Sequence, residues 1–476
     1  MSSQADTSSV IESRHLDYVP EHERHGKVWR QGPFWFLGNF QPFTVAIAFL
    51  GPVVGLNGLW TSVAGIGGIL FGTLFMAAHA AQGPKLGLPQ MIQSRAQFGY
   101  RGVILPVIAT TFTFVAFNVV DVVIIKQGLH GIFGWNATLV AIGISLAAAL
   151  LAIYGHDWIH KVFIGLFWVS LPFWIILTMG IFTGHAGGHG PLTGGFNVAG
   201  FFATFAVAAS YNITYAPYVS DYSRYLAKSS SVGGIITAVF VGAAGSPIWL
   251  IPVGAWMATR LGVADALTGI YSAGNSTIAH AGTILAIVAV LALVATMGIN
   301  AYSGMLSVVT IIDSIRPVKT GHKVRITTIV ALTAVWFILG IVLSNATTAL
   351  NNSLIIMLYL LAPWTSVNLI DFYAVRHGKF AITDFFNPSG IYGRWGVQGI
   401  AAYAVGILIE IPFMYIPSVY ESPGASWLNG VDISWILGLF VAGGLYFILT
   451  RGLDRSKEQE AIARSELALQ NNESMR

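Results

Sequence analysis

Twelve mostly apolar stretches, separated by short polar segments, run through this chain. They lie near residues 33–59, 62–82, 103–130, 137–155, 160–183, 197–220, 232–259, 280–312, 325–344, 352–374, 396–418 and 431–450. A membrane-spanning helix needs about 20 such residues, and within lipid its backbone bonds are satisfied internally. With 55% hydrophobic and only 9% charged residues, the chain has too much apolar surface for a soluble core. We therefore predict an all-α membrane protein with twelve transmembrane helices.

The positions of lysine and arginine test this topology, because positively charged loops stay in the cytoplasm. Of the 24 Lys and Arg residues, all but Lys126 and Arg260 fall in the two termini or in the connections that the twelve-span topology places on the same side. This predicts a protein of the cytoplasmic membrane with both termini inside. Residues 1–32 and 452–476 would be cytoplasmic tails, the second a solvated helix or a disordered end.

Proline interrupts the first and sixth spans, each time among polar and aromatic residues. Pro42 and Pro217 lack an N–H and clash with the carbonyl four residues earlier, so each span is predicted to break. Irregular backbone at membrane depth survives only where protein or water satisfies it. Two breaks five helices apart predict a 5+5 inverted repeat with a substrate site between them. Two ordinary proline kinks are the alternative.

This interpretation sets the expected organisation of the chain. The first repeat would comprise helices 1–5 (residues 33–183), the second would comprise helices 6–10 (residues 184–375), and two extra helices would follow (residues 376–451).

Aromatic and polar side chains inside the third span lie three and four residues apart, on one helical face. They are Phe117, Asn118 and Asp121, with Phe114 on the same face. A flat heterocycle needs an aromatic wall for stacking and an amide or carboxylate for its polar edge. An acid within a spanning helix is a functional candidate. Asp121 could instead lie near the outer interface or pair with Lys126.

Two other spans carry polar groups. Thr296 and Asn300 share a face of the eighth span, where a hydroxyl and carbonyls could hold Na⁺ and an amide could contact a heterocycle. Interhelical hydrogen bonding is the alternative. We expect a structural role for Glu410 in the eleventh span. The chain has no cysteine, which excludes thiolate metal sites. It has no phosphate-binding Gly-Lys-Ser/Thr loop, so no ATPase subunit is expected. No transition-metal site and no nucleic-acid partner are expected either.

Several longer motifs occur in one order between Glu12 and Tyr373. They are Tyr18-Val19-Pro20-Glu21, Arg24-His25-Gly26-Lys27, Ser94-Arg95-Ala96-Gln97-Phe98-Gly99-Tyr100-Arg101-Gly102, Ala216-Pro217-Tyr218-Val219-Ser220-Asp221-Tyr222-Ser223-Arg224-Tyr225, Asn300-Ala301-Tyr302-Ser303-Gly304, Pro363-Trp364 and Asp371-Phe372-Tyr373. Together they resemble the nucleobase:cation symporter-1 family, and within it the purine/cytosine permease-like branch. The resemblance implies the inverted-repeat fold of the sodium-coupled amino-acid transporters. It also implies import of nucleobases, hydantoins or related heterocycles with Na⁺ or H⁺.

The resemblance also assigns residues to sites. The implied Na⁺ positions are Gly38, Gln41, Ala295 and Thr296. The implied stacking aromatics are Phe117 and Tyr215, and the other implied substrate contacts are Gln41, Thr214, Ala216 and Asn300, to which the third-span face adds Asn118.

Two departures from the family pattern affect these assignments. The stacking positions hold Phe117 and Tyr215, where tryptophan is usual, and Thr296 follows Ala295 where sodium-coupled relatives carry two adjacent hydroxyls. The second departure leaves H⁺ coupling open, with Asp121 as the candidate proton carrier. The prediction is a secondary transporter without enzymatic activity or organic cofactor. The alternatives are an H⁺-coupled transporter of a vitamin-like pyrimidine or another small heterocycle, a channel, and an intramembrane enzyme.

Overall fold

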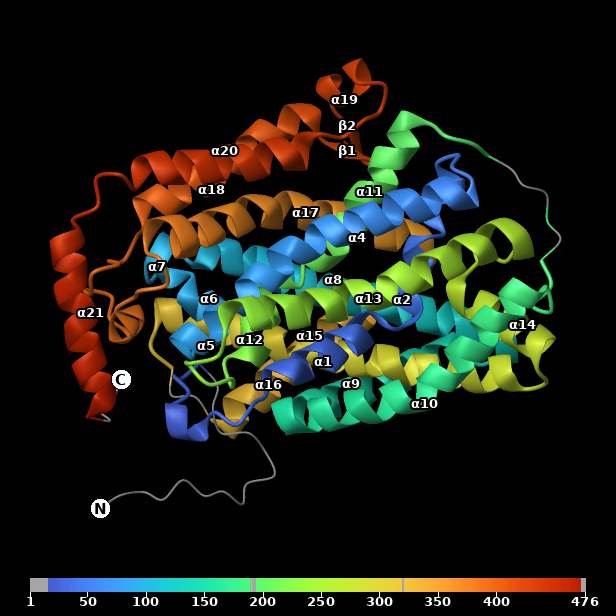
Figure 1. Ribbon diagram of the computed structural model, residues 1–476, viewed down its shortest axis with the longest axis horizontal. Helices are drawn as coiled ribbons and strands as arrows, with labels where there is room; N and C mark the ends of the chain where they lie inside the picture. The colour runs from blue at the N-terminus through green and yellow to red at the C-terminus, as the bar shows by residue number, and fades with distance from the viewer. Residues whose placement is uncertain (1–15, 189, 191–193, 319–320, 472–476) are drawn as a thin grey trace.

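The protein is a bundle of long helices whose axes are roughly parallel, with the first and last described residues at the same end (Figure 1). This computed structural model describes residues 16–188, 190, 194–318 and 321–471. The long helices are α4 (Gly58–Ala80), α8 (Ile104–Phe133), α9 (Ala137–Tyr154), α10 (His156–Thr183), α11 (Val198–Ile213) continued by α12 (Ala216–Ser223), α13 (Val232–Trp256), α15 (Ala281–Ile315), α16 (His322–Val342) and α17 (Ala346–Ile370).

Within the described residues, nine spans are long and apolar enough to cross a membrane, and a bent helix pair makes a tenth. The bent pair is the first predicted span, which comprises α1 (Gln31–Asn39), α2 (Pro42–Ile47) and α3 (Leu50–Val53). The last two predicted spans are the apolar helices α18 (Val397–Glu410) and α20 (Ser434–Leu449), both shorter than the others. The eleventh span is shorter than predicted because its helical residues end at Phe413, in a 3-10 turn, and an extended segment follows.

The two predicted interruptions are unequal. The first bends the chain by 55° between Asn39 and Pro42. The sixth is a two-residue turn at Thr214 and Tyr215, and Val198–Ser223 still forms one span. The difference has a local cause, because Thr214 and Tyr215 keep helix-like dihedrals whereas Gln41 is extended, with φ −158° and ψ 167°.

Several elements lie outside the predicted spans. Short helices α5 (Gln82–Leu86), α6 (Gln90–Gln93) and α7 (Arg95–Phe98) connect α4 to α8; α14 (Ala266–Thr277) precedes α15; strands β1 (Tyr415–Ile416) and β2 (Tyr420–Glu421) and helix α19 (Pro423–Trp427) precede α20. Irregular turns are η1 (Glu21–Glu23), η2 (Val28–Arg30), η3 (Met257–Leu261), η4 (Asp371–Val375), η5 (Ile382–Phe386) and η6 (Ile411–Phe413).

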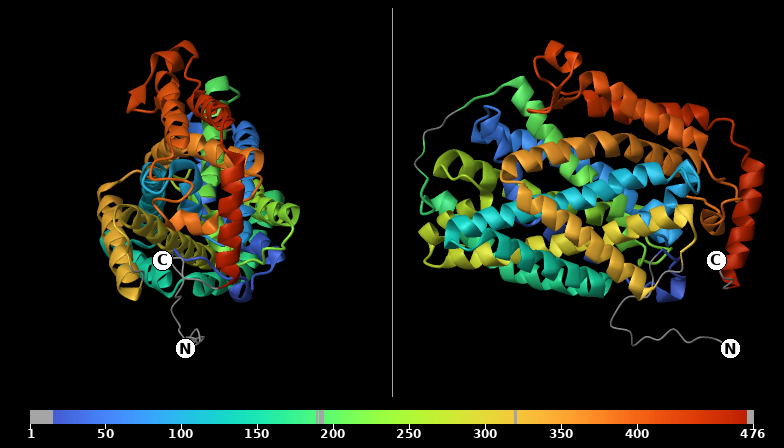
Figure 2. Two further views of the ribbon diagram at one scale, coloured as in Figure 1. Left: turned by 90° about the vertical axis from the view of Figure 1, so that its left-hand side faces the viewer. Right: turned by 180° about the vertical axis from the view of Figure 1, so that it is seen from behind.

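The C-terminal segment forms a helix, α21 (Arg455–Gln470), the first of the two predicted alternatives; most of its described side chains are exposed, and one face docks on the bundle. Its Glu458 carboxylate accepts a hydrogen bond from the buried Arg376 guanidinium, and Ser465 Oγ accepts one from Thr383 N at 3.1 Å. Figure 2 shows α21 lying across one end of the bundle, and α18 and α20 lying along the side of the bundle. Specific polar contacts, which composition does not reveal, account for the docking.

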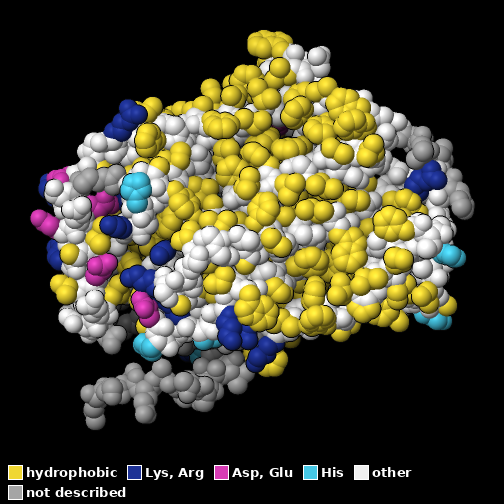
Figure 3. Space-filling view, viewed as in Figure 1, with side chains coloured by type: hydrophobic (Ala, Val, Ile, Leu, Met, Phe, Trp, Pro, Cys, Tyr) yellow, Lys and Arg dark blue, Asp and Glu magenta, His cyan; other side chains and the backbone are white. Residues whose placement is uncertain are grey.

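The surface matches a membrane-spanning bundle. In Figure 3 hydrophobic side chains cover the middle of the visible face, and most of the acidic and basic side chains gather at the end where α21 lies. Inside the bundle, small residues let helix backbones approach closely. A Cβ added at Gly72 of α4 would lie 2.2 Å from the Ala209 carbonyl oxygen of α11. A Cβ at Gly242 of α13 would lie 2.2 Å from the Gly32 oxygen of α1.

Candidate functional site

The first interruption places a glutamine at the centre of the bundle. Phe40 and Gln41 leave the helical conformation, and Pro42 begins α2, where a missing N–H costs nothing. Gln41 caps this new helix, since its Oε1 accepts a hydrogen bond from Phe43 N at 2.7 Å. Its Nε2 donates to Tyr211 Oη at 2.7 Å. Both ends of the predicted substrate-contacting amide are therefore used within the protein in this conformation.

The structure brings the two proposed stacking residues together. The rings of Phe117 (α8) and Tyr215 (start of α12) lie nearly parallel, with centroids 5.7 Å apart and an interplanar angle of 16°. A flat ring between them would need about 3.5 Å on each side, or about 7 Å in total. The slot is therefore closed, and a ligand must separate the two rings by more than about 1 Å.

Further aromatic residues surround this pair. Phe43 and Tyr211 stack at 5.1 Å with an angle of 8°, and Tyr211 and Tyr218 each contact Tyr215 edge-on. These three residues were missed at the sequence level. The signal was present for the tyrosines, because residues 211, 215 and 218 are spaced by four and three and so share one helical face.

The predicted amides also meet. Asn300 Nδ2 of α15 donates to Asn118 Oδ1 of α8 at 2.9 Å, and Asn118 Nδ2 donates to the Met297 carbonyl at 3.2 Å. Tyr218 Oη lies 3.3 Å from Asn300 Oδ1. All three polar side chains are buried. This chain of hydrogen bonds connects the third, sixth and eighth spans beside the aromatic rings.

The positions implied for Na⁺ are less well formed. The Gly38 carbonyl accepts a bond from Tyr215 Oη at 3.4 Å, and Thr296 Oγ1 donates back to the Ala292 carbonyl at 3.1 Å. Ala295 contributes no side-chain oxygen. Among the described residues, no hydrogen bond joins Thr296 to the first interruption. Thr214 Oγ1 likewise bonds within its own helix, to the Tyr211 carbonyl at 3.0 Å, and Ala216 is buried beside it.

Asp121 is the polar group of the third-span face that remains without a partner. It is 1% exposed, and its Oδ1 has no hydrogen-bond donor within the part of the chain that the structure describes. The alternative pairing with Lys126 does not form, because Lys126 Nζ donates to the Ile341 and Leu343 carbonyls at 2.8 and 2.7 Å. Asp121 is close enough to Tyr211, Tyr215 and Tyr218 to interact electrostatically with all three.

Glu410 lies apart from this site, against α20. It is fully buried, and neither carboxyl oxygen has a donor among the residues described. Its carboxyl fills the space that Gly438 leaves, since a Cβ at Gly438 would lie 1.7 Å from Oε1. These contacts agree with the expected interhelical role.

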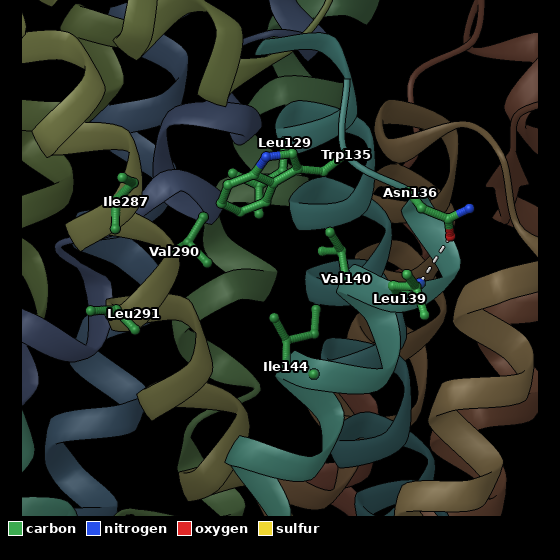
Figure 4. Close-up of a pocket in the computed structure, with 10 residues that line it drawn as sticks. Leu129, Trp135, Asn136, Leu139, Val140, Ile144, Ile287, Val290 and Leu291 are labelled. Carbon is green, nitrogen blue, oxygen red and sulfur yellow. Dashed lines mark hydrogen bonds between the residues drawn. The ribbon is translucent and has the colours of Figure 1, made fainter. Parts of the chain in front are cut away.

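A cavity of about 580 Å³ lies elsewhere, between the end of α8, the start of α9 and α15 (Figure 4). The residues that line it are Leu129, Trp135, Asn136, Leu139, Val140, Gly143, Ile144, Ile287, Val290 and Leu291. Figure 4 shows the Trp135 indole reaching from the start of α9 towards α15. None of the predicted site residues lines this cavity, and its exposed apolar walls belong to spanning helices. It is distinct from the candidate site.

Buried ionic contacts hold the end of the bundle near α21. Arg95 of α7 pairs with Asp313 of α15 at 2.9 Å and donates to the Phe385 carbonyl at 2.9 Å. Tyr100 Oη donates to the Asp313 carbonyl at 3.0 Å. The residues of this group are buried, so these contacts anchor the C-terminal end of α15, the eighth span.

The overall fold matches a solved membrane transporter. The nucleobase-cation-symport-1 family transporter Mhp1, closed with bromovinylhydantoin bound, superposes with a TM-score of 0.73 at 17% identity, covering 96% of this chain and 99% of that one. The inward-facing conformation of Mhp1 gives 0.70 at 18% identity, covering 96% and 98%. The chain therefore has the fold of a multi-pass membrane transporter. The intramembrane-enzyme alternative is excluded, since these relatives are permeases and transporters.

The sequence comparisons identify the family. The pattern of the permeases for cytosine/purines, uracil, thiamine and allantoin matches residues 18–438. The Bacillus subtilis protein YxlA, whose name assigns it to the purine-cytosine permeases, is 35% identical over 445 residues, covering 93% of this chain and 96% of its own length. This chain belongs to that permease family, as its motifs predicted.

Proposed function

We propose that this protein imports a nucleobase or a related heterocycle, of the cytosine, purine, hydantoin or allantoin type, by cation symport. The observation that carries the proposal is the nearly parallel pair Phe117 and Tyr215, at 5.7 Å, in the centre of the bundle. The two faces of this pair suit a flat ring, and stacking of a base on an aromatic side chain contributes about 1–3 kcal/mol. Asn118 and Asp121 lie on the same helix as Phe117, Asn300 of α15 bonds to Asn118, and these residues supply hydrogen-bonding groups for a ring edge.

In this proposal the ligand opens the slot between the two rings. Gln41, Asn300 and the backbone near Thr214–Ala216 then exchange bonds within the protein for bonds to the ring. A heterocycle without the matching donors and acceptors would leave these buried groups unpaired, at a cost of about 1–3 kcal/mol each. Such a penalty would select among rings of similar shape.

For the coupling ion we favour H⁺ over Na⁺. The implied Na⁺ positions supply only one side-chain hydroxyl, on Thr296, because Ala295 has none. A lone carboxylate in an apolar interior costs far more free energy than a protonated carboxyl. Asp121, buried without a donor among the described residues, is therefore our candidate proton carrier. Coupling requires that the ion bind the two access states differently.

We also place both termini in the cytoplasm and the protein in the cytoplasmic membrane. The gathering of charged side chains at the end of the bundle where α21 lies supports this orientation. The proposed repeats comprise residues 33–183 and 184–375, with the interruptions of the first and sixth spans facing each other across the site.

The test is a binding and uptake assay on purified protein. A ligand that binds only the folded state raises the apparent melting temperature, so a panel of nucleobases, hydantoins and allantoin identifies the substrate class. Uptake of the stabilising compound into proteoliposomes is then driven by a pH gradient or by a Na⁺ gradient. We expect accumulation with the pH gradient alone. Stabilisation by none of the heterocycles would refute the substrate class, and accumulation only with Na⁺ would refute the ion.

A further inference from the structure

Two asparagines join the interrupted helices directly. Asn39, the last residue of α1, donates through Nδ2 to Asn212 Oδ1 of α11 at 2.8 Å. Asn212 Nδ2 in turn donates to Thr73 Oγ1 of α4 at 2.6 Å. Both asparagines also donate to the Ala243 carbonyl of α13, at 2.7 and 3.2 Å. We call Asn39, Asn212, Thr73 and the Ala243 carbonyl the amide clasp. It brings four spanning helices together at one buried point.

A proline explains why the Ala243 carbonyl accepts these bonds. In a regular helix this carbonyl would accept the N–H of the residue four positions later. That residue is Pro247, which lies inside α13 and has no N–H. The carbonyl is thus left free within a spanning helix, where an unpaired backbone group is expensive. The two amides satisfy it, so the proline of α13 creates the acceptor of the clasp.

The clasp adjoins both halves of the proposed substrate site. The Asn39 carbonyl accepts a hydrogen bond from Thr44 Oγ1 at 2.6 Å, and Thr44 Oγ1 also lies 3.2 Å from Tyr211 Oη, the group that holds the Gln41 amide. On the other side, Asn212 lies three residues before Tyr215. A shift at the clasp therefore moves a predicted substrate contact in each interrupted helix.

Close backbone packing makes the four helices act together. α13 contacts α1 at Gly242, and Ser246 Oγ donates to the Phe36 carbonyl of α1 at 2.6 Å. α4 contacts α11 at Gly72, next to the clasp residue Thr73. The clasp lies where these two pairs of helices meet, and it supplies side-chain hydrogen bonds between them.

We propose that Asn39 and Asn212 are positioning residues, which through the amide clasp hold the first and sixth interruptions at a fixed separation. They set the distance between Gln41 and Tyr215, and so the position of the Gln41 amide relative to a ring that stacks on Tyr215. This role rests on the proposed substrate site. The clasp itself is independent of which heterocycle or ion is transported.

The decisive variant is Pro247→Ala, which touches neither asparagine. It restores an N–H that competes for the Ala243 carbonyl, and so removes the acceptor of the clasp. We expect it to raise the KM for uptake about tenfold per folded protein, and we expect Asn39→Ala and Asn212→Ala to do the same. Pro252→Ala, at the other proline inside α13, is the matched control and should leave KM unchanged. An unchanged KM in Pro247→Ala, or an equal rise in Pro252→Ala, would overturn the proposal.

A second measurement needs no ligand. Thermal unfolding of the wild type, Asn39→Ala, Asn212→Ala and the double variant tests whether the two amides act as a unit. We expect the double variant to melt no lower than the less stable single variant, whereas additive losses would refute the clasp. If the wild type binds no heterocycle, the proposed function fails, and this cycle still decides the clasp.

Discussion

The contact of α4 with α11 gives a prediction whose size follows from the geometry. A Cβ added at Gly72 would lie 2.2 Å from the Ala209 carbonyl oxygen and 3.0 Å from its carbon. An ordinary contact needs about 3.4 Å, so Gly72→Ala must separate the two helices by about 1.2 Å. Neither atom belongs to a flexible side chain that could move away. We expect a loss of about 1–3 kcal/mol in unfolding free energy, as for other overpacked interiors.

The assay is thermal unfolding of purified protein in detergent, together with the KM for uptake. At about 2–4 °C per kcal/mol, Gly72→Ala should melt several degrees below the wild type. Its KM should also rise, because the separation stretches the bond between Thr73 and Asn212. Gly143→Ala in α9 is the control, since a Cβ there meets nothing within 4 Å. Equal melting temperatures for the two variants would refute the reasoning.

Three further predictions concern the site and the end of the bundle near α21. Phe117→Ala removes one face of the stacking pair with Tyr215, and about 1–3 kcal/mol of lost stacking should weaken ligand binding by roughly 5- to 150-fold in a thermal-shift titration. Asp121→Asn should abolish accumulation driven by a pH gradient and leave exchange of substrate across the membrane intact. Arg95→Gln removes the charge that pairs with the buried Asp313, so unfolding free energy should fall by about 3–5 kcal/mol in thermal or denaturant unfolding.

Each of these variants has a matched control in the same chain. Phe112→Ala removes an exposed ring from the same helix as Phe117 and should leave binding unchanged. Glu410→Gln replaces a buried acid outside the site with an amide that cannot release a proton, and should leave accumulation intact. Arg101→Gln removes an exposed charge near α7 and should leave stability within error. A control that behaves like its partner would contradict the corresponding role, as would normal accumulation in Asp121→Asn.

Sequence reasoning recovered the spanning helices and their interruptions because both depend on local patterns. A run of apolar residues must be helical in lipid, and a proline must interrupt hydrogen bonding wherever it stands. The residues at the interruptions of the first and sixth spans were therefore visible before the structure. Tyr211 and Tyr218 were missed although their spacing from Tyr215 indicates one helical face. Many aromatic residues in a membrane protein only pack or face lipid, so spacing alone did not single them out.

Other features depend on long-range partners, which periodicity does not encode. The docking of α21 requires Glu458 to meet Arg376, and the closed slot requires Phe117 to meet a residue almost a hundred positions away. Gln41 lies in the predicted place, yet its amide is bound by Tyr211 in this conformation.

The sequence by itself thus determined that lipid surrounds the helices, where the spans and their interruptions lie, and which family the chain belongs to. Hydrophobicity, proline and motifs are all read over short stretches of sequence. Only the tertiary structure decided which polar atoms satisfy one another. The free carbonyl of Ala243 follows from Pro247 in the same helix, but its donors Asn39 and Asn212 come from two others. In lipid an unpaired polar group is costly, and which group from another helix satisfies it is a property of the packed bundle.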